Sequence, residues 1–143
     1  MLIGMHLLAK TESLNVLTKI DYTGYLKLKT SSKKGKGRRL QNYVVEKLLC
    51  IFDMLEDDDV KSAIMGESGE DIKLSPAARK QIPYSFECKN QERLNIWASL
   101  EQAEDNCNGY DPVLIFKRNR TKTYACINFD LFLNLIKRID DDR

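Results

Sequence analysis

Residues 82–91 have the sequence IPYSFECKNQ, and their side chains alternate in character. Ile82, Phe86 and Cys88 belong to one alternating set, whereas Glu87 and Lys89 belong to the other. Because alternate residues of a β-strand share a face, this pattern predicts a strand that holds a carboxylate and an ammonium side by side. Such pairs are common on solvated strands, so the meaning of this one depends on the segments around it.

The neighbouring segments predict one α/β domain with a mixed central sheet flanked by helices. Apolar residues at helical spacing predict helices from Arg38 to about Glu56, over 91–107 and near the C-terminus. Strands are predicted at 71–74, 84–89, 113–116 and 123–128. Residues 33–37 are predicted to form a Gly/Lys loop. Residues 1–30 show no clear period and are predicted to be an N-terminal arm or appendage to a domain of residues 31–143.

Composition restricts the classes of protein that fit. A chain of 143 residues with 43% hydrophobic and 31% charged residues has the size and balance of one soluble globular domain. The apolar opening segment is too short to span a membrane and lacks a basic start, so we expect no membrane partner and an intracellular location. The single histidine argues against a histidine-rich metal site or a Ser-His-Asp hydrolase. Four cysteines without C-x-x-C spacing predict buried free thiols rather than disulfides or zinc.

The net charge of +2 hides an uneven distribution. Residues 27–39 contain seven Lys or Arg and no acid, whereas acids are concentrated at 56–59 and 140–142. Clustered base among Gly and Ser is typical of segments that bind the phosphate backbone of nucleic acids. The residues expected to hold the backbone, together with amides at the helix start, are Lys33, Lys34, Lys36, Arg38 and Arg39. The alternative is a solvated linker without a partner.

A chemical site is predicted where two strands end. Asp71 begins one strand, and Glu87 and Lys89 end the next, so pairing of these strands brings two carboxylates and an ammonium together. Carboxylate oxygens suit Mg²⁺ or Mn²⁺, and the main-chain carbonyl of Cys88 is a further candidate ligand while its thiol packs in the core. Such a site polarises a phosphodiester and lowers the pKa of a bound water.

These residues resemble a known motif. Asp71, a spacer of fifteen residues and Glu87-x-Lys89 resemble the D-(x)n-E-x-K motif of the PD-(D/E)xK nuclease superfamily. Within it, the chain is similar to archaeal-type Holliday junction resolvases and related small phage endonucleases. They share a basic K-G segment before a helix, as in KGKGRRLQNYVVEKLL, a Ser-Gly loop like Ser68-Gly69, and a helix with Glu-Gln-Ala like residues 101–103. The resemblance covers about Lys33 to Asn128.

The resemblance implies a restriction-endonuclease-like core and a metal-dependent endonuclease selective for branched DNA. Asp71 and Glu87 are then expected to bind one or two Mg²⁺ or Mn²⁺ ions, and Lys89 to orient the attacking water or stabilise the transition state. Ser68 is expected to contact the scissile phosphate, and Gln102 to position water or DNA unless it is a plain solvent-facing glutamine. A two-fold homodimer matches two symmetric cuts, and a phage origin implies the host cytoplasm.

Two positions depart from the family pattern. If Gly37 is the anchor, the first-helix glutamate of the family falls on Gln41, which brings no charge, while Glu46 follows five residues later. Gln41 lies in the apolar half of the helical wheel and Glu46 outside it, so we expect Gln41 to point inward. The proline that precedes the motif aspartate is replaced by Glu70. Trp97 and Tyr43 are predicted to belong to the core, without a function.

Two other classes of function remain open. The first is a nucleic-acid-binding module that keeps the nuclease fold but has lost its chemistry. Gln41 supports this reading, whereas an intact set of Asp71, Glu87 and Lys89 argues against it. The second is a structural or protein-interaction domain whose basic stretch is a disordered arm.

Overall fold

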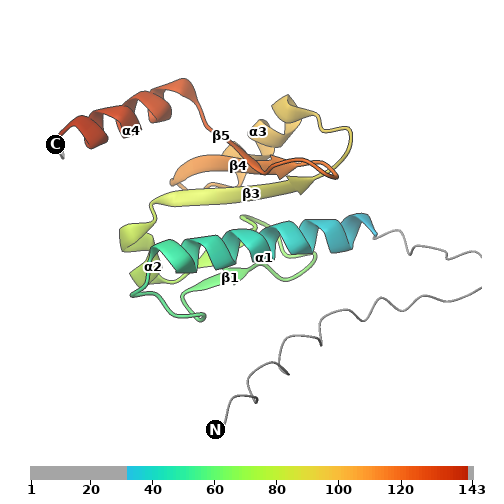
Figure 1. Cartoon of the computed structure of the whole chain (residues 1–143), viewed down its shortest axis with the longest axis horizontal. Coiled ribbons are helices and arrows are strands. Elements are labelled where there is room, and N and C mark those ends of the chain that lie inside the picture. The colour runs from blue at the N-terminus through green and yellow to red at the C-terminus, as the bar shows by residue number, and fades with distance from the viewer. Residues whose placement is uncertain (1–31, 142–143) are drawn as a thin grey trace, which may run out of the picture. The chain divides into compact units, whose positions relative to one another are not determined.

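The computed structural model describes residues 32–141, so the arm predicted for residues 1–30 lies outside the described part of the chain. The described elements follow the order α1 (Lys33–Ile51), β1 (Val60–Ser62), β2 (Ile72–Leu74), α2 (Pro76–Gln81), β3 (Tyr84–Asn90), α3 (Ile96–Asp105), β4 (Asp111–Lys117), β5 (Tyr124–Cys126) and α4 (Phe129–Asp141) (Figure 1). None of the helices within these residues is long and apolar enough to cross a bilayer.

The strands form a mixed arrangement. β3 and β4 are parallel, from Tyr84 opposite Asp111 to Asn90 opposite Lys117, and β5 pairs with β4 in the antiparallel sense. β1 and β2 form a separate antiparallel pair. The main-chain N–H of Asp71 donates to the carbonyl of Phe86 over 2.9 Å, which joins this hairpin to β3. Helices α1 and α3 both contact β3, so the predicted α/β protein with a mixed sheet flanked by helices is confirmed.

Helix α1 begins five residues earlier than predicted, and the predicted Gly/Lys loop at 33–37 is therefore wrong. The Ser32 side chain caps the helix by accepting the N–H of Gly35 at 3.1 Å. Each glycine inside a helix costs about 1 kcal/mol relative to alanine, which is why the sequence favoured a loop there. At the other end, Phe52 N–H donates to Leu48 O at 3.0 Å, and the helix stops before the acidic cluster.

Two short elements escaped prediction or were left undecided. β1 has three residues, too few for its alternation to be recognised, yet Val60 is fully buried. The segment after β2, which the sequence assigned to a turn or a brief helical connection, is the six-residue helix α2. It is capped by Ser75, whose hydroxyl accepts the N–H of Ala78 at 3.1 Å, and Pro76 occupies its first turn.

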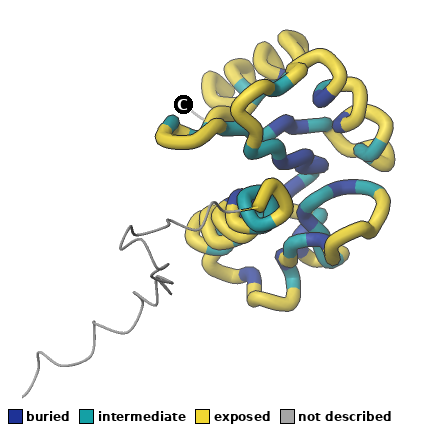
Figure 2. Tube along the Cα trace, turned by 90° about the vertical axis from the view of Figure 1, so that its right-hand side faces the viewer, coloured by how far each residue is buried: buried dark blue, intermediate teal, exposed yellow. Residues whose placement is uncertain are grey.

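The core lies along the middle of the described unit (Figure 2). Its buried apolar residues are Leu40, Val44, Leu55, Val60, Ile72, Ala78, Ile82, Phe86, Cys88 and Val113. Two aromatic residues expected in this core are outside it: Trp97 is 79% exposed and Tyr43 44% exposed. Among the free cysteines, Cys88 alone is buried and Cys50 is exposed, so the expectation of four buried thiols is also wrong.

Helix α4 is the most one-sided element of the described chain. Asn128 caps it, since its Oδ1 accepts the N–H of Leu131 at 2.8 Å. Leu131 is its only buried residue. Leu135 is half-buried, and five further large apolar side chains of the helix are 46–69% exposed, namely Phe129, Phe132, Leu133, Ile136 and Ile139. The helix therefore carries an apolar face with little to pack against among residues 32–141.

Candidate active site

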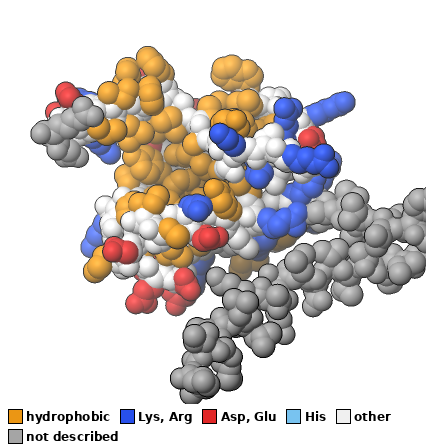
Figure 3. Space-filling view, in the orientation of Figure 1, with side chains coloured by type: hydrophobic (Ala, Val, Ile, Leu, Met, Phe, Trp, Pro, Cys, Tyr) orange, Lys and Arg blue, Asp and Glu red, His pale blue; other side chains and the backbone are white. Residues whose placement is uncertain are grey.

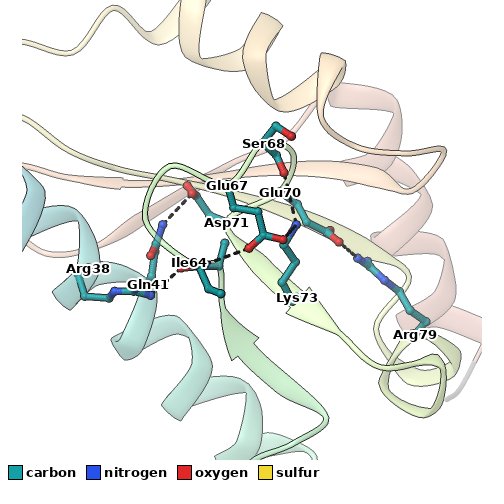
Figure 4. Close-up of polar contacts among 10 residues, drawn as sticks. Arg38, Gln41, Ile64, Glu67, Ser68, Glu70, Asp71, Lys73 and Arg79 are labelled. Atoms are coloured by element: carbon teal, nitrogen blue, oxygen red, sulfur yellow. Dashed lines mark hydrogen bonds and ion pairs between the residues drawn. The ribbon is translucent and has the colours of Figure 1, made fainter.

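Asp71 occupies the junction between the β1–β2 hairpin and β3. Its main-chain oxygen accepts the N–H of Ala63 at 2.8 Å, and its N–H donates to Phe86 O at 2.9 Å. The side-chain carboxylate of Asp71 accepts two further hydrogen bonds. Oδ1 accepts the Gln41 side-chain amide at 2.7 Å, and Oδ2 accepts the main-chain N–H of Cys88 at 2.6 Å. Two donors thus fix the direction of the Asp71 carboxylate, and Figure 4 shows the one from Gln41.

The loop before Asp71 has its own set of polar contacts. Gly69 has a φ of +96°, a conformation that favours glycine, and lies at the end of this loop. Glu67 accepts the N–H of Ile64 at 3.0 Å and pairs with Lys73 at 3.3 Å, and Lys73 also reaches the main-chain oxygen of Ser68 at 3.5 Å (Figure 4). These contacts stabilise the turn that delivers Asp71 to β3.

Glu87 and Lys89 extend from β3 toward α3. Glu87 is only 3% exposed. Its Oε1 accepts the Lys89 ammonium at 2.6 Å, and its Oε2 accepts the Asn106 amide at 3.3 Å. The same ammonium donates to Gln102 Oε1 at 2.8 Å. A chain of hydrogen bonds from Asn106 through Glu87 and Lys89 to Gln102 therefore attaches the second carboxylate to α3.

Electrostatics show that the two carboxylates influence each other. Burial raises the pKa of the Glu87 carboxyl above its ordinary value, the hydrogen bond from Lys89 lowers that pKa, and repulsion by the charge of Asp71 raises it again. Burial also raises the pKa of the Cys88 thiol, and the charges of Asp71 and Glu87 add to this effect. The Cys88 thiol is therefore protonated and is neither a nucleophile nor a thiolate ligand at neutral pH.

The donor set fits a hard divalent cation. Among residues 32–141 no group of three or more His, Cys, Asp or Glu side chains is arranged to hold a metal. Mg²⁺, however, is commonly held by one or two carboxylates, with waters and substrate phosphates completing its shell. Each oxygen of Asp71 and Glu87 accepts one hydrogen bond and keeps a further lone-pair site. A cation between them would relieve the repulsion that raises the pKa of Glu87.

Uncharged groups of Cys88 and Gln41 lie beside the Asp71 carboxylate. The N–H and C=O of one strand residue point to the same edge, so the Cys88 carbonyl lies on the Asp71 side of β3, as its N–H does. Gln41 presents its amide to Asp71, whereas Glu46 is exposed. Ser68 is exposed on the loop before Asp71, and its described contact uses the main-chain oxygen rather than the hydroxyl.

The basic residues of α1 fall into two groups. Lys33, Lys34 and Arg39 are exposed, and Lys36 is half-buried. Helix α1 begins near the right-hand end of the view in Figure 1, and blue side chains gather at the same end in Figure 3. Arg38 differs, because one of its guanidinium nitrogens donates to both Ser62 Oγ and Ala63 O, each at 2.7 Å. Arg38 therefore attaches α1 to the β1–β2 hairpin through one nitrogen of its guanidinium group.

Several residues of this region gave no signal in the sequence. Glu70 is buried and forms an ion pair with Arg79, whose guanidinium also donates to Tyr84 O at 2.7 Å and stacks 4.0 Å from the ring centroid of Tyr110. The position of the family proline thus holds a structural ion pair. Asn106 caps the end of α3 and reaches Glu87. Neither partnership follows from spacing, because the partners come from different elements.

No protein-family model, curated protein or solved structure matches this chain. The geometry around Asp71 and the motif resemblance are therefore the grounds for a functional assignment.

Proposed function

We propose that this protein is a metal-dependent DNA endonuclease with a restriction-endonuclease-like core, which hydrolyses phosphodiester bonds in branched DNA. The observation that carries the proposal is the attachment of Asp71 to β3. Two hydrogen bonds, Asp71 N to Phe86 O and Cys88 N to Asp71 Oδ2, bring its carboxylate to the strand that carries Glu87 and Lys89. Two carboxylates and an ammonium at one strand end match the chemistry of phosphodiester hydrolysis.

Each residue of the set has a defined task in this proposal. Asp71 and Glu87, with the Cys88 carbonyl and the Gln41 amide oxygen as neutral neighbours, hold one or two Mg²⁺ or Mn²⁺ ions. When bound, such an ion supplies Lewis-acid polarisation of the phosphate and a water of lowered pKa. Lys89 orients the attacking water or stabilises the negative charge on the phosphate, and Gln102 fixes the direction of its ammonium. Ser68 contacts the scissile phosphate.

The DNA backbone is bound by the start of α1. Lys33, Lys34, Lys36 and Arg39 place positive charge there, and the first turn of the helix contains no acid. The N-terminus of a helix carries a partial positive charge, so lysines there are unfavourable. A phosphate bound near the main-chain N–H groups of the first turn offsets that cost. An enzyme acting on DNA in this way works inside a cell, in the host cytoplasm if the chain is phage-encoded.

A second copy of the chain is the partner that the apolar face of α4 fits best. Hydrophobic side chains form a continuous surface from α4 across the sheet to α1 (Figure 3). That surface combines a ridge, the α4 face, with an apolar groove of about 260 Å³ lined by Ile51, Phe86 and Tyr124 among others. A surface holding both a ridge and a groove is self-complementary, as a two-fold interface requires.

The exposed area of this surface is that of an interface. At about 200 Å² for a large side chain, the exposed parts of Ile51, Tyr124 and the five exposed apolar residues of α4 amount to roughly 790 Å². A standard interface buries about 800 Å² per partner. The largest apolar patch of a typical monomer is about 300–600 Å². A two-fold dimer formed in this way presents two sites to two strands.

The test is cleavage of a labelled four-way junction and a matched linear duplex with Mg²⁺, Mn²⁺ or EDTA. Wild type is expected to cut the junction symmetrically and only with a metal. Lys89→Ala is expected to bind the junction without cutting it, because it lacks the ammonium near the phosphate. Lys80→Ala, an exposed change on α2, is the matched control and should cut like wild type.

One observation favours a second candidate, a nucleic-acid-binding module without chemistry. Gln41 donates its amide to Asp71 where the resembled enzymes carry a carboxylate, so the site has one negative charge fewer. If wild type binds both DNAs and cuts neither with any metal, this candidate replaces the first. Gln41→Glu would then show whether the missing charge is the reason, since restored cutting by that variant assigns the loss to this position.

A further inference from the structure

A basic cavity lies on the other side of β3 from Glu87 and Lys89. It has a volume of about 440 Å³, and its wall contains Arg39, Tyr43, Asn90, Lys117, Lys122 and Thr123. Neighbouring side chains of a strand point to opposite faces. Lys89 accordingly reaches Gln102 on α3, whereas the Asn90 amide donates to Lys36 O on α1 at 3.3 Å. The cavity is therefore one residue along β3 from the candidate active site and on the α1 side.

The charge of this cavity has one sign. Three of the lining residues are cationic, and no acid lines it. Within residues 32–141, neither Lys117 nor Lys122 takes part in a described ion pair. Lys117 and Lys122 thus bring to this concave surface positive charge that no described acid compensates, and such a surface concentrates the electrostatic potential and attracts anions. The cavity is thus built for an anion.

The wall of the cavity also contains groups that a simple inorganic anion would not contact. Asn90 Oδ1 is buried and has no hydrogen-bond partner among the described residues, which is costly for a polar atom. The half-exposed ring of Tyr43 forms another part of the wall. A ligand with a phosphate and a flat apolar face matches both the positive charge and the Tyr43 ring, and nucleotides have this combination. The volume lies within the range of small-molecule sites.

We propose that this cavity binds one nucleotide of the DNA strand. The phosphate lies among Arg39, Lys117 and Lys122, and the base packs on Tyr43. That the nucleotide belongs to a DNA substrate rests on the nuclease function proposed above. The cavity would then hold the strand at a second point, across β3 from the scissile phosphate.

A titration of the full chain tests the cavity without any cutting. The probes are thymidine 5′-monophosphate and inorganic phosphate, each followed by NMR or calorimetry. We expect the nucleotide to bind at least tenfold more tightly than phosphate. The double variant Lys117→Ala/Lys122→Ala should lose at least tenfold in nucleotide affinity. The control Lys61→Ala/Lys80→Ala removes two exposed lysines elsewhere and should bind like wild type. Equal affinities for the two probes, or an unchanged double variant, would overturn the proposal.

Junction binding at several salt concentrations separates this inference from the proposed function. Each lost phosphate contact lowers the slope of log affinity against log salt by about 0.7 to 0.9. The cavity variant should therefore show a shallower slope than wild type, and the control pair an unchanged one. If wild type cuts the junction and the cavity variant keeps the full slope, the cavity inference fails while the nuclease stands. If wild type cuts no DNA but the nucleotide binds in a Lys117- and Lys122-dependent way, the nuclease fails and the cavity stands.

Discussion

Around Asp71 and Glu87, all four carboxylate oxygens accept hydrogen bonds from the chain itself. Along α4 the reverse holds, because its apolar side chains face outward, with Phe129 69% and Ile139 60% exposed. The first region has its partners within the described residues. Helix α4 has an apolar face that few described residues cover, so only a partner packed on that face would stabilise it further. Isolated helices of this length are marginal in water, which makes that requirement stronger.

This difference separates the expected effects of substitution. Changes around Asp71 remove a partner that the fold already supplies, so they alter both chemistry and folding stability. Changes on α4 remove surface that the described unit does not use, so they alter association. Four variants, from the largest expected effect to the smallest, test that division.

Asp71→Ala is expected to have the largest effect. It removes a charge at the proposed metal site and leaves the Gln41 amide and the Cys88 N–H without their acceptor. Junction cleavage should fall on the order of a thousandfold. Because the alanine variant also loses stability, Asp71→Asn is measured beside it, since its amide oxygen still accepts one of these bonds. Asp58→Ala, whose carboxylate is 91% exposed, is the control. Normal cleavage by folded Asp71→Asn would rule out the proposed site.

Arg79→Ala should destabilise the fold without touching the chemistry directly. It leaves the buried Glu70 carboxylate without its cation, a change that typically costs about 3–5 kcal/mol. The measurement is the free energy of unfolding in urea, with Lys80→Ala as the neighbouring control. A loss below about 1 kcal/mol would show that Glu70 finds water or another partner, and that the region around Asp71 is less self-contained than described.

The pair Phe132→Asp and Ile136→Asp tests the other side of the comparison. It places two charges on the apolar face of α4, where both residues are about half exposed. We expect the double variant to sediment as a monomer and to keep the circular dichroism spectrum of wild type. Asn134→Asp adds charge to the polar side of the same helix and should leave association unchanged. Wild type that is itself monomeric at all concentrations would remove the dimer from the proposal.

The smallest effect concerns pH. In EDTA, the raised pKa of Glu87 means that the folded state binds its proton more tightly than the unfolded state does. The free energy of unfolding should therefore decrease as pH rises from the ordinary value of 4.5 through the raised pKa, by at most about 1.4 kcal/mol per pH unit. Glu87→Gln should flatten this slope and Glu104→Gln, an exposed change on α3, should not. A slope of opposite sign in the difference between wild type and Glu87→Gln would contradict the burial effect.

Much of the candidate site follows from alternation and order in the sequence. The parity of Glu87 and Lys89 predicts their shared face. Their approach to Asp71 was predicted through pairing of the two strands, but β2 pairs with β1 instead, and Asp71 is joined to β3 by its hydrogen bond to Phe86. The apolar half of the first helix likewise indicates that Gln41, not Glu46, points inward. These are local regularities that a single segment displays, so they survive without knowledge of the fold.

The missed features have different physical causes. The helical start of α1 depends on a cap at Ser32 that offsets two glycines. The role of Arg38 depends on β1, which is too short to be recognised in advance. Trp97 lies on the outside of α3 although a helical stripe of apolar residues favoured the core. Of these three, only the role of Arg38 is set by a contact between distant segments, whereas the Ser32 cap lies three residues from its donor and Trp97 is exposed.

The hydrogen bond between Asp71 N and Phe86 O joins segments that are separate in an incompletely folded chain. The carboxylates of Asp71 and Glu87 belong to different pieces of chain, and they meet only once the hairpin has docked on β3. A partly folded or locally opened molecule has the basic helix start but no assembled pair of carboxylates. On the proposed function, such a molecule binds DNA without cutting it. On that proposal, a copy whose hairpin has not docked on β3 does not nick DNA.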